Sequence, residues 1–127
     1  AEVTIGIDLR PDSLIGEPFG VNLRRRVHLI AGTAEDNGPL AGVRVAVSRS
    51  VGHGRCLWLA RGGHLIRRSC TRPFYLGARL TDSLRWTLRV PHLLPRGTWT
   101  VRSLATDTTG LTERLRNGRN VNRFRLR

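Results

Sequence analysis

The residues that could do chemistry in this chain are two cysteines and four histidines, with nine acidic side chains and a large excess of arginine. Four of them are close in sequence, namely His53, Cys56, His64 and Cys70. Their spacing fits no zinc motif, and thiolate ligands would exclude a disulfide. The chain has no Gly-x-Ser-x-Gly elbow and no His-Glu-x-x-His pair, and the absence of lysine excludes Schiff-base catalysis and a P-loop. The sequence predicts a protein that is not an enzyme and has no zinc site.

The two cysteines flank a predicted hairpin. Residues 57–59 and 65–68 lie on either side of a turn that contains Gly62 and Gly63. A hairpin centred on Gly63 pairs residues whose numbers sum to 126, which places Cys56 opposite Cys70. A disulfide there closes a loop of about 15 residues and adds about 3 kcal/mol by the chain-entropy treatment. Because disulfides persist in oxidising compartments, this pairing predicts a secreted or cell-surface protein; the alternative is two separate buried thiols.

Apolar and polar residues alternate along most of the chain. The runs cover residues 2–9, 27–31, 43–47, 83–90, 98–102 and 122–126. This period of two is typical of strands with one buried face. No segment of 12 or more residues shows helical apolar spacing, and no apolar stretch is long enough to span a membrane. The pattern predicts an all-β chain of about seven strands, packed as an antiparallel sandwich.

The charge of the chain comes from one residue type. All 22 basic residues are arginines, and against nine acidic residues they give a net charge of +13. Guanidinium groups suit phosphate, sulfate and carboxylate groups, so anionic glycans, wall polymers, membrane headgroups and nucleic acid are all chemically sensible partners. Nucleic acid is the least favoured, because the chain lacks an RNP-type motif, a recognition helix and a zinc-finger spacing. The alternative is a purely compositional excess of arginine on a solvated surface.

Several segments carry a resemblance to a known family. Residues 97–110 read GTWTVRSLATDTTG, residues 31–36 read AGTAED, residues 42–47 read GVRVAV and residues 118–126 read GRNVNRFRL. In the same order, these segments resemble strands of the bacterial immunoglobulin-like modules of secreted and cell-surface proteins. Trp99 departs from the family pattern, which has tyrosine there, and the hairpin at about residues 52–75 is an extra insertion.

The resemblance covers most of residues 25–127, and the length of the chain suits about one domain. Together they imply that residues 1–127 form a single immunoglobulin-like antiparallel β-sandwich with an extra disulfide-closed hairpin. The resemblance also implies a non-catalytic structural or adhesive module that joins other domains or subunits of a surface assembly. In that topology the third, sixth and seventh strands share one sheet, and their outward positions carry Arg44, Arg102, Arg123, Arg125 and Arg127. As an alternative function, these arginines form a polyanion-binding face, whose partner would be an anionic glycan or wall polymer. A further alternative is self-assembly into a filament or layer through edge strands at residues 2–9 and 120–127.

Acidic residues at two turns make calcium an open alternative. In the immunoglobulin-like topology, the turn after the second strand and the turn after the sixth lie at the same end of the sandwich. Their oxygen ligands are Glu35, Asp36 and Asp107. The favoured interpretation is that Asp36 and Asp107 form turns by accepting hydrogen bonds from nearby backbone amides, because no calcium-loop spacing is present.

The aromatic residues divide into two groups. Trp86 and Trp99 fall on the apolar phase of strong strands, which predicts core packing. Trp58, Phe74 and Tyr75 lie in or near the hairpin. We expect these three to cap one end of the core, and the alternative is an exposed platform for sugar stacking or a protein interface.

Overall fold

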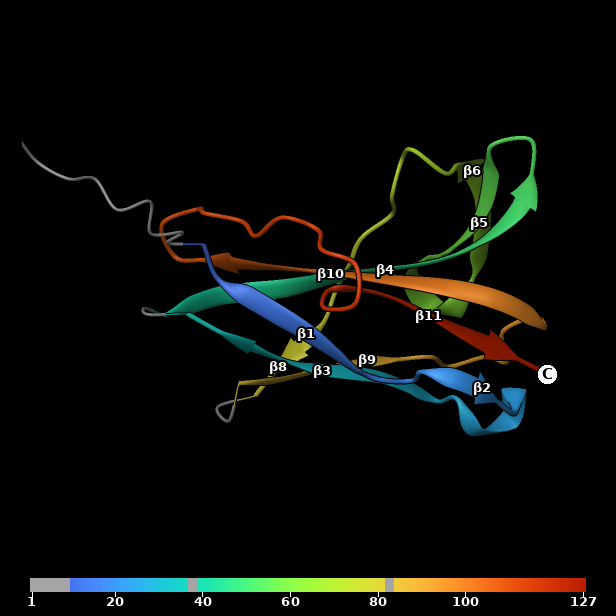
Figure 1. Ribbon diagram of the computed structural model, residues 1–127, viewed down its shortest axis with the longest axis horizontal. Coiled ribbons are helices and arrows are strands. Elements are labelled where there is room, and N and C mark those ends of the chain that lie inside the picture. The colour runs from blue at the N-terminus through green and yellow to red at the C-terminus, as the bar shows by residue number, and fades with distance from the viewer. Residues whose placement is uncertain (1–9, 37–38, 82–83) are drawn as a thin grey trace, which may run out of the picture.

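The computed structural model describes residues 10–36, 39–81 and 84–127, and strands dominate them (Figure 1). In chain order the strands are β1 (Asp12–Glu17), β2 (Gly20–Asn22), β3 (Leu29–Glu35), β4 (Leu40–Gly52), β5 (Arg55–Leu59), β6 (Leu65–Ser69), β7 (Leu76–Gly77), β8 (Arg79–Leu80), β9 (Arg85–Arg89), β10 (Gly97–Asp107) and β11 (Val121–Leu126). Two 3₁₀ turns, η1 (Arg24–Arg26) and η2 (Arg61–Gly63), complete the described elements. No described helix is long and apolar enough to cross a membrane. The predicted all-β fold is confirmed.

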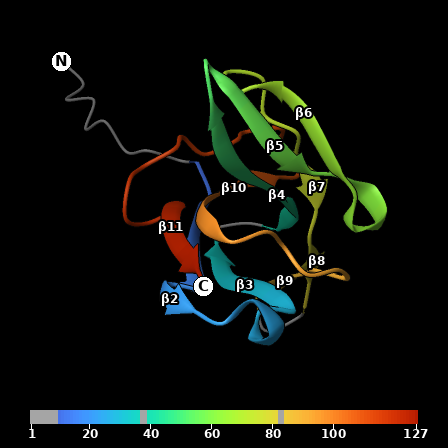
Figure 2. The same cartoon turned by 90° about the vertical axis from the view of Figure 1, so that its right-hand side faces the viewer.

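The strands form two sheets that pack face to face (Figures 1 and 2). The four-stranded sheet has the order β1-β3-β9-β8. The seven-stranded sheet has the order β2-β11-β10-β4-β5-β6, and β7 pairs with β4 beside this path. Neighbouring strands are antiparallel in both sheets, except that β2 runs parallel to β11. The predicted antiparallel sandwich therefore contains one short parallel pair.

The hydrophobic core fills the space between the two sheets. Trp86 on β9 and Trp99 on β10 are both fully buried in it, as their apolar phase predicted. Each indole N–H donates to a backbone carbonyl, that of Thr33 at 3.1 Å and that of Pro95 at 2.8 Å. Gly32 packs so closely against Trp86 that a Cβ there would lie 2.6 Å from the indole ring. The main core thus combines apolar burial with satisfied polar atoms.

A buried carboxylate, that of Glu113, links the two sheets. Glu113 is 5% exposed and joins β1 to β10. Its oxygens accept hydrogen bonds from the backbone N–H of Ser13 and that of Ala105, both at 2.8 Å, and from the Ser13 hydroxyl. The hydroxyls of Ser13 and Ser103 lie 2.7 Å apart. Burial raises the pKa of Glu113 above its ordinary value, although the hydrogen bonds act against this.

Several predicted runs coincide with observed strands. The runs at residues 43–47, 98–102 and 122–126 lie within β4, β10 and β11, and much of the run at 83–90 forms β9. The run at residues 2–9 lies outside the described residues. The expectation of an edge strand at residues 120–127 is wrong, because β11 lies between β10 and β2. That segment is therefore paired on both sides over residues 124–126.

Candidate anion-binding face

Strand register places the predicted arginines on one face of the seven-stranded sheet. Arg102 on β10 pairs with Ala46 on β4, and Arg44 on β4 pairs with Leu104 on β10. Arg123 on β11 pairs with Thr100, two residues before Arg102. Because side chains alternate along a strand, residues two apart share a face, and directly paired residues share it too. Arg44, Arg102 and Arg123 therefore lie on a common face.

This face points away from the core. The residues that flank these arginines along the strands face inward and are buried, as in Val43, Val45, Val101 and Phe124. Arg44, Arg123 and Arg125 are exposed, and Arg102 is half-buried. Arg127 follows β11 and is also exposed; its backbone N–H donates to the Asn22 carbonyl at 3.1 Å. The five arginines thus occupy the outward positions that the alternation predicted.

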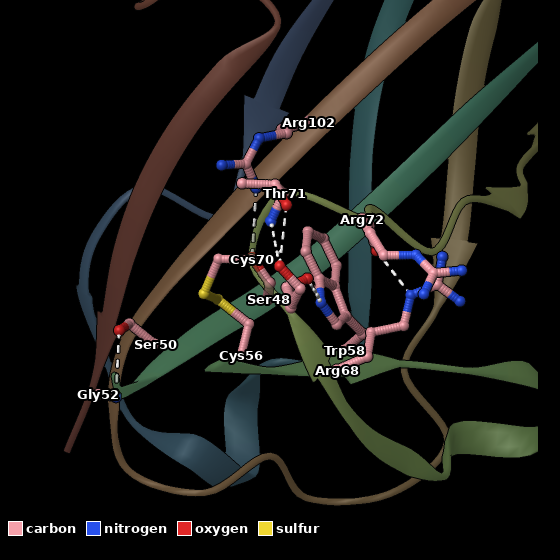
Figure 3. The surroundings of a disulfide bond; sticks show 11 residues. Ser48, Ser50, Gly52, Cys56, Trp58, Arg68, Cys70, Thr71, Arg72 and Arg102 are labelled. Carbon is pink, nitrogen blue, oxygen red and sulfur yellow. Dashed lines mark hydrogen bonds between the residues drawn. A yellow bond between two sulfur atoms is a disulfide. The ribbon is translucent and has the colours of Figure 1, made fainter. Parts of the chain in front are cut away.

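The β5–β6 hairpin extends the same sheet beyond β4. The predicted disulfide is present: Cys56 is bonded to Cys70, with their Cα atoms 5.0 Å apart (Figure 3). Its predicted register is wrong, because Cys56 pairs with Arg68 across the hairpin and Cys70 lies just beyond β6. The turn has its centre at Gly62, one residue earlier than predicted. The Cys70 N–H instead donates to the Gly54 carbonyl at 2.9 Å.

The hairpin builds a small apolar group on the outward face, which we call the outer cluster. Its members are Ala46, Cys56, Trp58, Ile66, Cys70, Phe74 and Tyr75. Trp58 is fully buried at its centre, and its indole N–H donates to the Ser69 carbonyl at 3.2 Å. The expectation that Trp58, Phe74 and Tyr75 cap the main core is wrong, because they form this separate cluster on the other face of the sheet.

Three arginines lie over the three aromatic rings of the outer cluster. The guanidinium carbon of Arg102 lies 5.7 Å from the centre of the Trp58 ring. Arg44 lies 5.5 Å from the Tyr75 ring, and Arg68 lies 5.5 Å from the Phe74 ring. These distances are typical of cation–π contacts, which hold the planar cation against the ring and leave its outer edge in solvent. We call Arg44, Arg68, Arg102, Arg123 and Arg125 the arginine face.

Hydrogen bonds fix two of these guanidinium groups further. Arg102 donates to the Ser48 hydroxyl at 3.2 Å (Figure 3). Arg68 donates to the carbonyl of Arg72 at 2.6 Å and to that of Pro73 at 3.0 Å. The alternation-based prediction did not include Arg68, although it shares a face with Cys56 once the hairpin register is known. Its ring partner, Phe74, comes from the segment after the disulfide.

The electrostatic surroundings of the arginine face are cationic. Burial raises the pKa of Tyr75, and the nearby guanidinium groups of Arg102 and Arg44 act against this increase. In the described part of the chain, no member of the arginine face forms an ion pair with a carboxylate. Ion pairs occur elsewhere, between Arg85 and Glu17 and between Arg116 and Asp12. Among the described residues, the face therefore presents five cations without ion-pair partners, and three of them are held over aromatic rings.

The acidic residues of the calcium alternative are Glu35, Asp36 and Asp107. Asp107 accepts hydrogen bonds at one oxygen from the Thr109 hydroxyl at 2.7 Å and from the N–H groups of Thr109 and Leu111 at 2.9 Å each. The Thr109 hydroxyl is the main cause of its lowered pKa. Glu35 is exposed at the end of β3, where its backbone lies opposite that of Asp12 in the β1–β3 pairing, and Asp36 follows it in the chain. Among the described residues, no three His, Cys, Asp or Glu side chains form a group that could hold a metal ion.

Comparison with protein families and with curated proteins finds no match.

Proposed function

We propose that this chain is an immunoglobulin-like module of an extracellular protein, and that it binds an anionic polysaccharide through the arginine face. The module class is supported by strand order. Variable-type immunoglobulin sandwiches have strands A, B, E and D in one sheet, and C′ and C″ extend the G-F-C sheet. Assigned in chain order, β1-β3-β9-β8 corresponds to the first sheet and β11-β10-β4-β5-β6 to the second. The disulfide-closed hairpin then takes the place of C′ and C″.

The extracellular assignment is supported by the disulfide. Cys56 is 5% exposed and its bond to Cys70 lies beside Trp58 in the outer cluster. A bond that holds a structural cluster together needs an oxidising compartment to persist. A non-catalytic role in adhesion agrees with a site made of ordered cations.

The observation that carries the binding proposal is the row of guanidinium groups held over aromatic rings. Each cation is positioned before a ligand arrives, so less side-chain entropy is lost on binding. The arginines of the face come from β11, β10, β4 and β6, and β5 lies between the last two, so the face spans five neighbouring strands of one sheet. It therefore suits an extended polymer that carries repeated anionic groups.

The burial of the aromatic rings in the outer cluster favours a polysaccharide over single-stranded nucleic acid. Proteins that bind single strands stack bases on exposed aromatic side chains. Trp58 is fully buried, and Phe74 and Tyr75 are half-buried beneath arginines. The face thus offers charge and hydrogen-bond donors but no open stacking platform.

The test compares two variants of equal net charge. The face variant carries Arg44→Gln, Arg102→Gln and Arg123→Gln. The control variant carries Gln at three exposed arginines elsewhere, Arg25, Arg114 and Arg119. Binding of size-defined heparin fragments is measured by calorimetry at several salt concentrations.

We expect the face variant to bind heparin fragments about 10-fold or more weakly, a change of about 1.4 kcal/mol. Its slope of log affinity against log salt should also fall by about one for each lost ion contact. The control variant should keep both values near those of the wild type. Equal losses in the two variants would contradict a defined face, and tighter binding of a single-stranded DNA of equal charge would overturn the choice of polysaccharide.

A further inference from the structure

A groove opens on the side of the sandwich where β9, β8 and the β5–β6 hairpin approach one another. It has a volume of about 920 Å³. Its walls come from β9, from β7 and β8, and from residues 59–63 at the tip of the hairpin. Figure 2 shows this side of the molecule, with the hairpin and β8 on the same flank. Cavities of about 300–1,000 Å³ are the usual size for small-molecule ligands.

The groove reaches the apolar interior. Leu59 and Leu88 belong to the main core, at 1% and 8% exposed, and both line the groove. Leu76 packs against the same core and also lines it. An alkyl chain in the groove would therefore contact leucine side chains, which favours its transfer from water.

The hairpin tip is docked against the opposite sheet. Gly63 has a φ of +83°, and a Cβ on it would lie 2.6 Å from both Pro91 and His92 in the segment after β9. The turn is closed by the Ala60 N–H, which donates to the His64 carbonyl at 2.7 Å. This contact joins the two sheets at one end of the groove. The hairpin tip therefore forms one wall of the groove.

The charged residues that line the groove are all arginines. They are Arg61 on η2, Arg79 on β8 and Arg89 on β9. All three are exposed, and no described residue forms an ion pair with any of them. No acidic side chain is among the described residues that line the groove. A ligand there meets a positive rim around an apolar floor.

We propose that this groove binds a small amphipathic anion, a medium-chain fatty acid, with its alkyl chain on the leucine floor and its carboxylate among the three arginines. Guanidinium groups recognise carboxylates through paired hydrogen bonds. This site uses none of the residues of the arginine face, so the proposal is independent of polysaccharide binding.

The test uses a series of simple ligands on the intact, oxidised protein, below their micellar concentrations. Acetate, octanoate, decanoate and dodecanoate are titrated by calorimetry. We expect affinity to rise by up to about fourfold per buried methylene and acetate to show no measurable binding. Dodecyltrimethylammonium has the same tail with a cationic head and should bind at least 10-fold more weakly than dodecanoate. Equal affinity for acetate and dodecanoate, or for the cationic and anionic ligands, would overturn the proposal.

Variants locate the site. A groove variant with Gln at Arg61, Arg79 and Arg89 should bind dodecanoate at least 10-fold more weakly. The control variant at Arg25, Arg114 and Arg119 should bind it as the wild type does. Equal weakening in both variants would contradict the groove site. If the wild-type protein binds dodecanoate but not heparin fragments, only the polysaccharide proposal is contradicted. If it binds heparin fragments but not dodecanoate, only the fatty-acid proposal is contradicted.

Discussion

The main core and the outer cluster lie on opposite faces of the seven-stranded sheet, and they are ordered by different means. Among the described residues, the main core contains 17 buried residues from both sheets and the segments beside them, and no cross-link passes through it. The outer cluster contains three buried residues, a disulfide and three arginine–ring contacts. Where apolar burial is small, a covalent link and cation–π contacts supply order that a larger core obtains from packing. The same contacts position three cations of the arginine face, those of Arg44, Arg68 and Arg102.

The largest expected effect concerns the main core. Trp86→Ala removes a fully buried side chain and leaves the Thr33 carbonyl without its indole donor. We expect the free energy of unfolding to fall by about 3–5 kcal/mol. Urea unfolding followed by circular dichroism measures this. A loss below about 1 kcal/mol would show that the main core does not dominate stability.

The next effect concerns the disulfide. Replacing both Cys56 and Cys70 by alanine leaves no free thiol and opens a loop of about 15 residues, so we expect a loss of about 3 kcal/mol by the chain-entropy treatment. The loosening should concentrate in the outer cluster, because the main core keeps its packing. Hydrogen exchange should speed up for β5 and β6 more than for β3 and β9. Uniform acceleration across both sheets would contradict the division into two regions.

The free energy of unfolding should depend on pH through Glu113, which links β1 to β10 and is not part of the outer cluster. Because the pKa of Glu113 is raised by burial, the folded chain holds its proton more strongly than the unfolded chain does. Its contribution to the free energy of unfolding is therefore greatest below the ordinary glutamate pKa and is lost as pH rises through the raised value. The difference between wild type and Glu113→Gln, measured by urea unfolding across this range, should decline with rising pH. A pH-independent difference would rule out this linkage.

That comparison also removes the contribution of Asp107. Its lowered pKa acts in the opposite sense, since its stabilisation is present above the ordinary aspartate pKa and is lost as pH falls through the lowered one. Both proteins contain Asp107, so its effect cancels in the difference.

The smallest effect on stability concerns a single arginine. Arg102→Gln removes the contact with the Trp58 ring and the hydrogen bond to Ser48, and we expect a loss of about 0.5–2 kcal/mol. The matched change Arg125→Gln removes an exposed arginine that lies over no ring. It should change stability by less than about 0.5 kcal/mol. Equal losses in the two variants would mean that the cation–π contact does not order the outer cluster.

Much of the fold could be predicted because alternation and burial coincide. Trp86, Trp99 and Phe124 are buried, at the positions that the apolar–polar alternation of their strands predicted to face inward. β1 was missed for a physical reason: its inward positions include Ser13, which is buried through its bonds to Glu113, while Leu14 is 40% exposed. A pattern of apolar residues cannot indicate a strand whose inward face is partly polar.

The candidate site could be predicted only in part. Alternation placed Arg44, Arg102 and Arg123 outward, and this needs no knowledge of distant residues. Two of the rings beneath the cations belong to Phe74 and Tyr75, which follow the disulfide and fold back onto the sheet. No local sequence pattern indicates where that segment packs. The disulfide was predicted correctly, but its register depended on the turn geometry at Gly62, which has a φ of +74°.

The most direct test of the arginine face is an amide NMR titration of the ¹⁵N-labelled protein with a sulfated hexasaccharide. The measurement reports which backbone amides sense the ligand. The proposal predicts that the largest shift changes fall on β4, β6, β10 and β11, around Arg44, Arg68, Arg102 and Arg123, and that they saturate together. Changes scattered over all exposed arginines, or concentrated on β3 and β9, would contradict it.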